Sequence, residues 1–358
     1  MVNRKSLVPG ATTVDPVTTQ HRHVRARALG LLLGAALDRA VPDPRRGHPV
    51  ALFGAAAARL ERWAYRPSRA RGAAFTALAV GSVAMLGTLG ERVRNPALRA
   101  ALTAGATWAV VGGDMLGREA ERIADALEAG DIDAARRRLP HLCGRDPESL
   151  DEKGIARATV ESVAENTSDA VVAPLVWGGL LGLPGLLGYR AVNTLDAMVG
   201  HRSDRYERFG WASARLDDVA NWAPARLTAL LAAAAAPLVS GDVRRTLRIR
   251  ARYGRCHPSP NAGHCEAAFA GALDLRLGGT NSYRGRIDHR PELGVGRHPE
   301  VHDIRRAVRL ARAVNGAAAL TAVLLAALPS APRPSRRTDG HKHSRGPRGA
   351  TRSVKGLT

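Results

Sequence analysis

Carboxylate and amide side chains crowd the start of segment 158–189, directly before a long apolar run. Glu161, Glu165 and Asp169 recur every four residues, and Asn166 lies among them. On a helix that turns about 100° per residue, side chains at this spacing lie one above another. A divalent cation would neutralise them, and magnesium binds one or two carboxylates while sharing its remaining shell with phosphate and water. The spacing favours a magnesium site over the alternative, a solvated acidic face, because charge beside an apolar segment is costly.

Two further clusters of the same composition lie beside apolar runs. The first stands in "YRAVNTLDAMVG", and the second in "SARLDDVANWAPARL". In both, carboxylates and amides suit magnesium, while arginine forks pair bidentately with phosphate or carboxylate. The sequence therefore predicts that three membrane-edge helices converge on one site. The two clusters consist of Arg190, Asn193 and Asp196, and of Arg215, Asp217, Asp218, Asn221 and Arg226.

The stretch "CHPSPNAGHCEAAFAGALDLRLGG" carries a different signal. Ser259 before Pro260 predicts a helix N-terminus, which attracts anions. Asn261 and Glu266 follow within the first turns. Gly278 and Gly279 would let backbone amides approach a phosphate, although Gly-Gly after a helix is more often a C-cap and turn.

Composition limits the compartment and the partners. Net charge is +21 and the pI is about 11.3, which is typical of proteins that bind nucleic acid or anionic membrane. About half of the excess lies in residues 1–27 and 329–358, two basic tails expected to be disordered. The three cysteines form no CxxC pair, and the Cys256-His257 and His264-Cys265 pairs are not expected to bind zinc. No secretory signal is evident.

Apolar runs predict an all-α, polytopic integral membrane protein with polar helical segments between its spans. Three charge-free runs (72–90, 170–189 and 313–332) are long enough to cross a bilayer, and shorter ones lie at 28–37, 100–113 and 227–241. Their Ala, Gly and Leu content favours helix over strand and allows close helix packing. We expect a basic tail (1–27), a membrane-embedded catalytic domain (28–328) and a second basic tail (329–358). The alternative is a soluble protein with buried alanine-rich helices.

Several motifs together resemble the CobD/CbiB family of cobalamin biosynthesis proteins. They include "ARATVESVAENTSDAVVAPLVWG", "YRAVNTLDAMVGHRSDRYERFGWASARLDDVANWAPARLTA" and "SPNAGHCEAAFAGALDLRLGG", and "VPDPRRGHPVALFG" resembles the family's opening, with His48 before Pro49. The resemblance runs from about residue 28 to 330. Ala170 and Pro42 stand where the family pattern has glycine.

The resemblance implies a multi-pass enzyme of the cell (inner or plasma) membrane, adenosylcobinamide-phosphate synthase. Such a ligase joins aminopropanol, or its O-phosphate, to a carboxylate of (adenosyl)cobyric acid with ATP and magnesium. It also implies a corrinoid, membrane lipid and other cobalamin-assembly membrane proteins as partners, and no nucleic acid.

Each site residue then has an expected role. Metal ligands are expected at Glu165, Asp169, Asp217 and Asp218; Glu161 is the expected base; Asn166, Arg190, Asn193, Asp196, Arg215 and Asn221 complete the catalytic set; and His48, Ser259, Asn261, Glu266, Gly278 and Gly279 are expected to bind substrate.

Three other functions compete with this interpretation. A membrane prenyltransferase would use "DDVAN" and "NTLD" to hold magnesium diphosphate. A nucleic-acid binder would use the basic tails, and a transport or assembly subunit would hold a corrinoid without chemistry.

Overall fold

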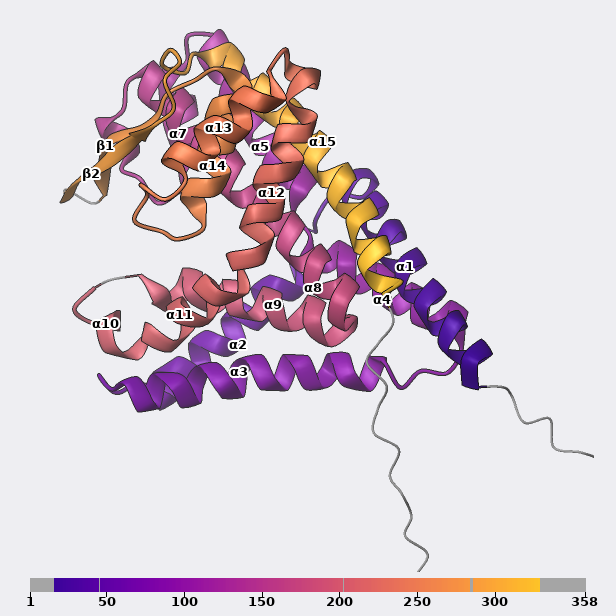
Figure 1. Cartoon of the computed structure of the whole chain (residues 1–358). Coiled ribbons are helices and arrows are strands. Elements are labelled where there is room, and N and C mark those ends of the chain that lie inside the picture. The colour runs from indigo at the N-terminus through magenta and orange to yellow at the C-terminus, as the bar shows by residue number, and fades with distance from the viewer. Residues whose placement is uncertain (1–15, 45, 202, 284–285, 329–358) are drawn as a thin grey trace, which may run out of the picture. The chain divides into compact units, whose positions relative to one another are not determined.

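The computed structural model describes residues 16–328 except 45, 202 and 284–285, and these residues form a helical protein with one two-stranded sheet (Figure 1). Contacts group them into one compact unit that ends at Leu328. The elements are α1 (Pro16–Ala40), α2 (Pro49–Ala64), α3 (Arg69–Gly90), α4 (Pro96–Val110), α5 (Gly113–Glu128), α6 (Ile132–Arg138), η1 (Leu139–His141), η2 (Pro147–Ser149), α7 (Glu152–Thr167), η3 (Ser168–Val172), α8 (Ala173–Leu181), α9 (Leu183–Leu195), η4 (Asp196–Gly200), α10 (Tyr206–Phe209), α11 (Trp211–Ala220), α12 (Trp222–Ala235), η5 (Ala236–Val239), α13 (Val243–Tyr253), α14 (Ala262–Leu273), β1 (Leu277–Tyr283), β2 (Arg286–Leu293) and α15 (Val301–Ala326).

The N-terminal helix begins inside the segment predicted to be a disordered tail. α1 starts at Pro16, twelve residues before the expected boundary at 28. Residues 17–27 contain no glycine or proline, and the basic side chains among them are good helix formers, so the helix of the apolar run extends backward. Residues 1–15 and the tail 329–358 lie outside the described residues.

α1 and α4 pack closely because small residues face each other. A Cβ added to Gly30 would lie 2.5 Å from Cβ of Thr103, and one added to Gly34 would lie 2.3 Å from Cβ of Thr107. Glycines four residues apart therefore let the two backbones approach, a packing mode typical of membrane helices.

The apolar run 170–189 is not one spanning helix, contrary to the prediction. It is interrupted at Gly182, whose φ of 70° and ψ of −150° suit glycine alone. α8 ends before it, α9 starts after it, and Leu183 N donates to Glu91 Oε1 at 3.1 Å, which caps the second helix. The run therefore forms a helical hairpin, and each arm is too short to cross a bilayer.

Three helical stretches are long and apolar enough to cross a membrane: Arg69–Gly90, Trp222–Val239 and Val301–Ala326. Apolar side chains on two of them face outward, including Leu78 and Leu86 on α3 and Leu320 and Leu324 on α15, each more than half exposed. Outward leucines of this kind indicate contact with an apolar phase or a partner. The predicted run 72–90 falls on α3, and run 313–332 falls on α15 as far as residue 326, with 329–332 outside the described residues. Run 227–241 falls on α12 and η5 as far as residue 239.

α14 lies at the centre of the core. All its residues from Ala262 to Leu273 are buried, and α7, α12, α13 and α15 pack around it. Small residues make this possible, since "AGHCEAAFAGAL" offers few side chains wide enough to hold neighbours apart. The helix nevertheless buries His264 and Glu266, and a glutamate is rarely buried without a partner.

The strands correct the all-α prediction for residues 277–293. β1 and β2 form an antiparallel hairpin in which Leu277 pairs with Leu293 and Gly279 with Arg290. Arg157 of α7 donates to the carbonyl oxygen of Gly278 and, at 2.8 Å, to that of Thr280. Contacts from α7 therefore hold a strand in a segment where local composition alone gave no strand signal.

Candidate functional site

Carboxylates from separate helices gather around one cavity of about 280 Å³, called the acidic pocket below. Its walls come from the end of α7, from η3, η4 and α11, and from the start of α14. Eight residues predicted from the sequence meet here. The lining residues are Glu165, Ser168, Asp169, Asp196, Gly200, Ala214, Asp217, Asp218, Asn221, Ala225, Ser259, Asn261, Ala262 and Cys265.

Two of the carboxylates stand on π-helical segments, Asp169 on η3 and Asp196 on η4. Near η3 the cause is Pro174, which lacks the N–H that would bond to the Ala170 carbonyl in a regular helix. That carbonyl instead accepts from Gly112 N at 3.2 Å. π-helical turns are rare and concentrate at functional sites.

Amide and hydroxyl groups orient Asp217. Asn221 Nδ2 donates to Asp217 Oδ2 at 2.9 Å, and Tyr189 OH donates to Asn221 Oδ1 at 2.7 Å. Asn193 Nδ2 lies 3.5 Å from Asp217 Oδ1, and Arg190 Nη1 lies 3.5 Å from Asn193 Oδ1. The chain from Arg190 to Asp217 joins two of the predicted clusters through side chains. Sequence reasoning missed Tyr189, although it is the one hydroxyl at the polar end of the apolar run 170–189.

The pocket carboxylates resist ionisation. Burial, reinforced by neighbouring carboxylates, raises the pKa of Asp196 to about 7. Burial also raises the pKa of Asp217 to about 6, although hydrogen bonds from Asn221 and Asn193 oppose the shift. The pKa of Asp169 lies well above its ordinary value, and that of Glu165 is raised too, again chiefly through burial. Burial lowers the pKa of Arg190, although Tyr189 and Asp169 oppose the shift. A proton or a bound cation must therefore offset the negative charge here.

A second wall of the pocket joins α11 to the start of α14. Asn261 Nδ2 donates to the Asp218 carbonyl at 2.8 Å, while Asn261 Oδ1 accepts from Arg226 Nη1 at 2.7 Å. α14 begins at Ala262, two residues later than the predicted cap implies. The Ser259 hydroxyl still accepts from the Ala262 backbone N–H at 3.2 Å, so its predicted capping contact is present.

Glu161, the expected base, does not line the pocket. Its Oε1 accepts from Gly278 N at 2.6 Å, and its Oε2 pairs with Arg145. Both oxygens thus tie α7 to β1 and to the loop that carries Arg145. These contacts support a positioning role for Glu161.

The glycine pair at 278–279 does not form the expected phosphate loop. Both residues lie in β1 with positive φ, 85° and 89°. The Gly278 amide already serves Glu161, and its carbonyl accepts from Arg157. A Cβ added to Gly278 would clash with the carbonyl oxygen of Pro291 in β2, so the close approach of the two strands requires a glycine there.

The remaining predicted residues lie around the pocket rather than in it. Asn166 Nδ2 donates to the Ser162 carbonyl at 2.9 Å. Arg215 is exposed and lies 3.5 Å from Asp218. Glu266 is buried with Oε1 3.8 Å from His257 Nε2, and burial raises its pKa.

His48 occupies the N-cap position of α2, where its side chain makes no capping hydrogen bond within the described part of the chain, and it does not line the pocket. Its Nε2 lies 3.6 Å from Asp43 Oδ1, too far for a hydrogen bond. Asp43 also favours the charged form of Arg190. The opening motif therefore lies near Arg190 rather than among the pocket carboxylates.

The donor set of the pocket suits a hard cation. Carboxylate, amide and hydroxyl oxygens are the ligands that magnesium prefers, and one or two carboxylates suffice. Within the described ranges, no group of three or more His, Cys, Asp or Glu side chains is arranged closely enough to enclose a metal ion. The side chains therefore fit an ion that completes its shell with phosphate and water, and they do not fit a closed metal site.

Comparison with known proteins gives one consistent family. The family model described as CobD/Cbib protein matches residues 31–311. A protein named cobalamin biosynthesis protein CobD from Mycobacterium tuberculosis (strain ATCC 25618 / H37Rv) is 54% identical over 301 residues, 84% of this chain and 96% of that protein. Proteins of the same name from Rhodobacter capsulatus and Geobacter metallireducens are 43% and 44% identical, covering 85% and 74% of this chain and 98% and 85% of their own lengths. No solved structure matches the chain significantly.

Proposed function

Because this chain belongs to the CobD/CbiB family of cobalamin biosynthesis proteins, we propose that it is a magnesium- and ATP-dependent ligase that forms an amide. In this proposal it joins aminopropanol, or its O-phosphate, to a side-chain carboxylate of (adenosyl)cobyric acid, giving (adenosyl)cobinamide or its phosphate. The product bond is an amide C–N bond, and the oxygen lost from the carboxylate leaves with phosphate.

The acidic pocket is the observation that carries this proposal. Five carboxylates from three parts of the chain face one cavity. Burial raises the pKa of Asp196 to about 7 and that of Asp217 to about 6, so both groups hold protons more readily than an exposed aspartate. Such a site costs stability unless a ligand compensates it. A cation paired with phosphate oxygens supplies that compensation, and amide formation from a carboxylate needs phosphate activation of the same kind.

Roles in the pocket follow from position. Asp169, Asp217, Glu165 and Asp218 would hold magnesium, which when bound offsets phosphate charge. Arg190 would face the anionic end of a substrate. Asn193 and Asn221 keep Asp217 in place through the contacts at 3.5 Å and 2.9 Å.

Asp196 is the proton acceptor in this proposal. The attacking amine must lose a proton, and a carboxyl with a pKa of about 7 is well matched to take it at neutral pH. Glu161, engaged on both oxygens, is less suited to that step.

Membrane insertion belongs to the same proposal. The three candidate spans and their outward leucines fit a multi-pass protein of the plasma membrane. Asp196, Asp217 and Asp218 lie outside these spans, and Asn221 directly precedes the second. Polar groups at such an edge meet a water-soluble nucleotide without crossing the lipid.

The test is product formation by membranes from a host that lacks its own enzyme. We expect cobyric acid, aminopropanol phosphate, ATP and magnesium to give a product of the amide's mass. Asp217→Asn should lower product formation about a hundredfold or more, whereas Arg309→Gln, an exposed change on α15, should leave it unchanged.

Two outcomes would redirect the assignment. Turnover of a polyprenyl diphosphate, with no corrinoid product, would favour a prenyltransferase that uses the same carboxylates. Corrinoid binding without product would favour a transport or assembly subunit.

A further inference from the structure

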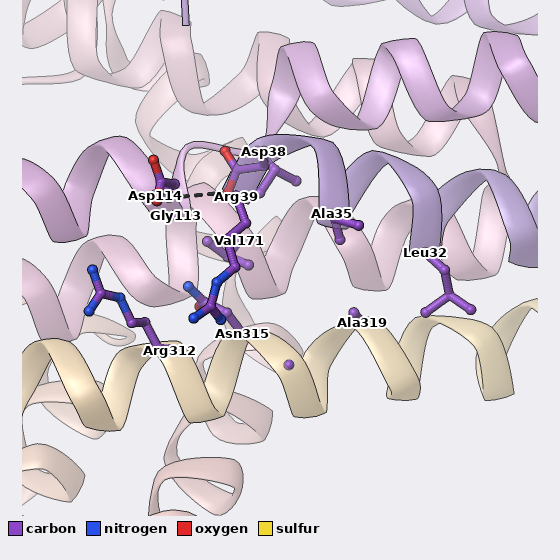
Figure 2. A pocket seen from close by; sticks show the side chains of 13 residues that line it. Leu32, Ala35, Asp38, Arg39, Gly113, Asp114, Val171, Arg312, Asn315 and Ala319 are labelled. Carbon is purple, nitrogen blue, oxygen red and sulfur yellow. Dashed lines mark hydrogen bonds between the residues drawn. The ribbon is translucent and has the colours of Figure 1, made fainter. Parts of the chain in front are cut away.

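A second cavity, of about 210 Å³, lies between α1, α5 and α15 (Figure 2). It shares no lining residue with the acidic pocket, although η3 contributes Val171 here and Asp169 there. None of the residues to which the proposed reaction assigns a role lines it. The lining residues are Leu32, Ala35, Ala36, Asp38, Arg39, Val111, Gly113, Asp114, Val171, Arg312, Asn315, Gly316 and Ala319.

Two of the charged groups in this cavity are already paired. Arg312 bonds to Glu121 through both of its terminal nitrogens, at 2.8 and 3.0 Å. Asp114 pairs with Arg118, one turn along α5. These pairs form part of the wall and leave other groups to meet a ligand.

Three groups retain unused hydrogen-bonding capacity. Asn315 Oδ1 is buried and, among the described residues, has no hydrogen-bond partner. Within the same part of the chain, Arg39 forms no hydrogen bond or ion pair, and Figure 2 shows it pointing from α1 toward Asn315. Asp38 Oδ2 accepts only backbone N–H groups, with Asp114 N at 3.1 Å. A buried acceptor without a donor is costly, so a ligand that donates would be stabilised here.

Asp38 and Asn315 converge from opposite helices. A Cβ added to Gly113 would lie 2.7 Å from Asn315 Nδ2 and 3.4 Å from Asp38 Oδ2. The missing side chain at Gly113 therefore leaves room between the Asp38 carboxylate on α1 and the Asn315 amide on α15, whose Oδ1 is the acceptor without a donor among the described residues. Two acceptors with a guanidinium beside them suit a ligand that carries both signs of charge.

The polar and the apolar lining groups lie at opposite ends of this cavity. Figure 2 shows the polar groups at one end and Leu32 and Ala319 at the other. Its volume of about 210 Å³ is smaller than that of the acidic pocket, about 280 Å³, and suits a small polar group. The ligand is thus small, with a polar end and an apolar extension along α15, one of the candidate spans.

We propose that this cavity binds a phosphoethanolamine-type group, an ammonium and a phosphate joined by a short carbon chain. The ammonium donates to Asp38 and to Asn315 Oδ1, and the phosphate accepts from Arg39. Leu32, Ala35 and Ala319 contact whatever apolar chain follows.

Two sources present this chemistry: an aminophospholipid headgroup and a free aminoalkyl phosphate. The second includes an amine substrate of the proposed reaction, and in that case the inference rests partly on the proposed function. Binding is measured without cobyric acid or ATP, so failure of the reaction and failure of this site remain distinguishable.

The experiment compares amine with quaternary ammonium probes on the full-length protein. Native mass spectrometry would count retained phosphatidylethanolamine or phosphatidylcholine after extraction from nanodiscs of each lipid, and calorimetry would measure ethanolamine phosphate and phosphocholine. We expect the amine probe to bind at least about tenfold tighter in one or both arms, because a quaternary ammonium has no N–H to donate. Preference only in nanodiscs identifies the lipid, and preference in solution identifies the free phosphate.

Variants locate the site. Arg39→Gln, an exposed change, and Asn315→Leu should each weaken binding about tenfold, because each removes one polar contact. Arg309→Gln on the same helix as Asn315 should leave binding unchanged. Equal binding of choline and ethanolamine probes, no binding of either, or full binding by both cavity variants would overturn the proposal.

Discussion

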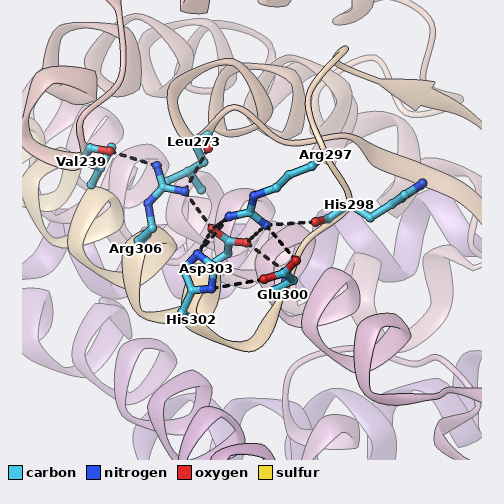
Figure 3. Close-up of polar contacts among 8 residues, drawn as sticks. All are labelled: Val239, Leu273, Arg297, His298, Glu300, His302, Asp303 and Arg306. Carbon is cyan, nitrogen blue, oxygen red and sulfur yellow. Dashed lines mark hydrogen bonds and ion pairs between the residues drawn. The ribbon is translucent and has the colours of Figure 1, made fainter.

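Buried carboxylates are compensated in opposite ways in two regions of the molecule. At the start of α15, the fully buried Asp303 accepts from Arg297 at 2.7 and 2.9 Å, from Arg306 at 2.8 Å and from Glu300 N at 2.9 Å (Figure 3). Arg306 also donates to the carbonyls of Leu273 and Val239, which joins α15 to α14 and η5. That carboxylate is neutralised by the protein itself and is structural.

The acidic pocket lacks such compensation. Asp169, Asp196 and Asp217 face one another, and the groups that contact Asp217 are neutral amides. Burial and like charge therefore raise their pKa values instead of being offset. Arginines thus neutralise the carboxylate that joins helices, whereas charge stays unbalanced in the acidic pocket, where we propose that a cation binds.

The largest expected effect separates function from stability in the pocket. Asp217→Asn and Asp169→Asn should each lower product formation about a hundredfold or more, because each removes a charge that the cation requires. Thermal unfolding of the same variants without magnesium should shift upward or stay unchanged, since one of several repelling charges is gone. Loss of folding together with activity would mean that these carboxylates are structural like Asp303.

The opposite result, a loss of stability without a loss of activity, is expected at Asp303. Asp303→Ala should lower the free energy of unfolding by about 3 kcal/mol or more, because it leaves two arginines beside a buried vacancy. Chemical denaturation of the purified chain measures this. Activity per folded molecule should persist; a variant that stays as stable as the parent but inactive would reverse the comparison.

pH provides a further contrast. The pKa of Asp196 is about 7 and that of Asp217 about 6, against an ordinary value of 3.8, so the folded state holds protons that the unfolded state has lost. Stability without magnesium should therefore fall as pH rises from about 4 to about 7. Magnesium binds the deprotonated groups, so its stabilising effect on the melting temperature should be larger at pH 8 than at pH 5. Asp217→Asn should show a smaller difference, and an equal magnesium effect at both values would contradict the assignment.

The smallest effect on stability is expected from the exposed Arg215 beside the acidic pocket. Arg215 is exposed and lies 3.5 Å from Asp218, and such surface pairs contribute less than about 1 kcal/mol. Arg215→Gln should leave the unfolding midpoint almost unchanged. A large decrease in the midpoint would show that Arg215 offsets the negative charge of the pocket carboxylates.

The residues that line the acidic pocket were easier to predict from the sequence than the residues and elements that hold them in place. Asp169, Asp217 and Asn221 were identifiable because carboxylates and amides recur at helical spacing beside apolar runs. Tyr189 and the neutral environment of Asp217 were not, because a hydroxyl gains its partner only through tertiary packing. The hairpin at 277–293 and the break at Gly182 also escaped prediction, since each depends on contacts from distant residues, Arg157 and Glu91.

Magnesium binding to the purified protein distinguishes a cation site from a purely structural cluster of carboxylates in the acidic pocket. Calorimetry at pH 8 in the presence of a non-hydrolysable ATP analogue should show one magnesium-dependent binding event in the parent chain and in Arg309→Gln. Asp217→Asn and Asp169→Asn should lose that event while remaining folded. Unchanged magnesium affinity in both folded variants would contradict the proposed cation site.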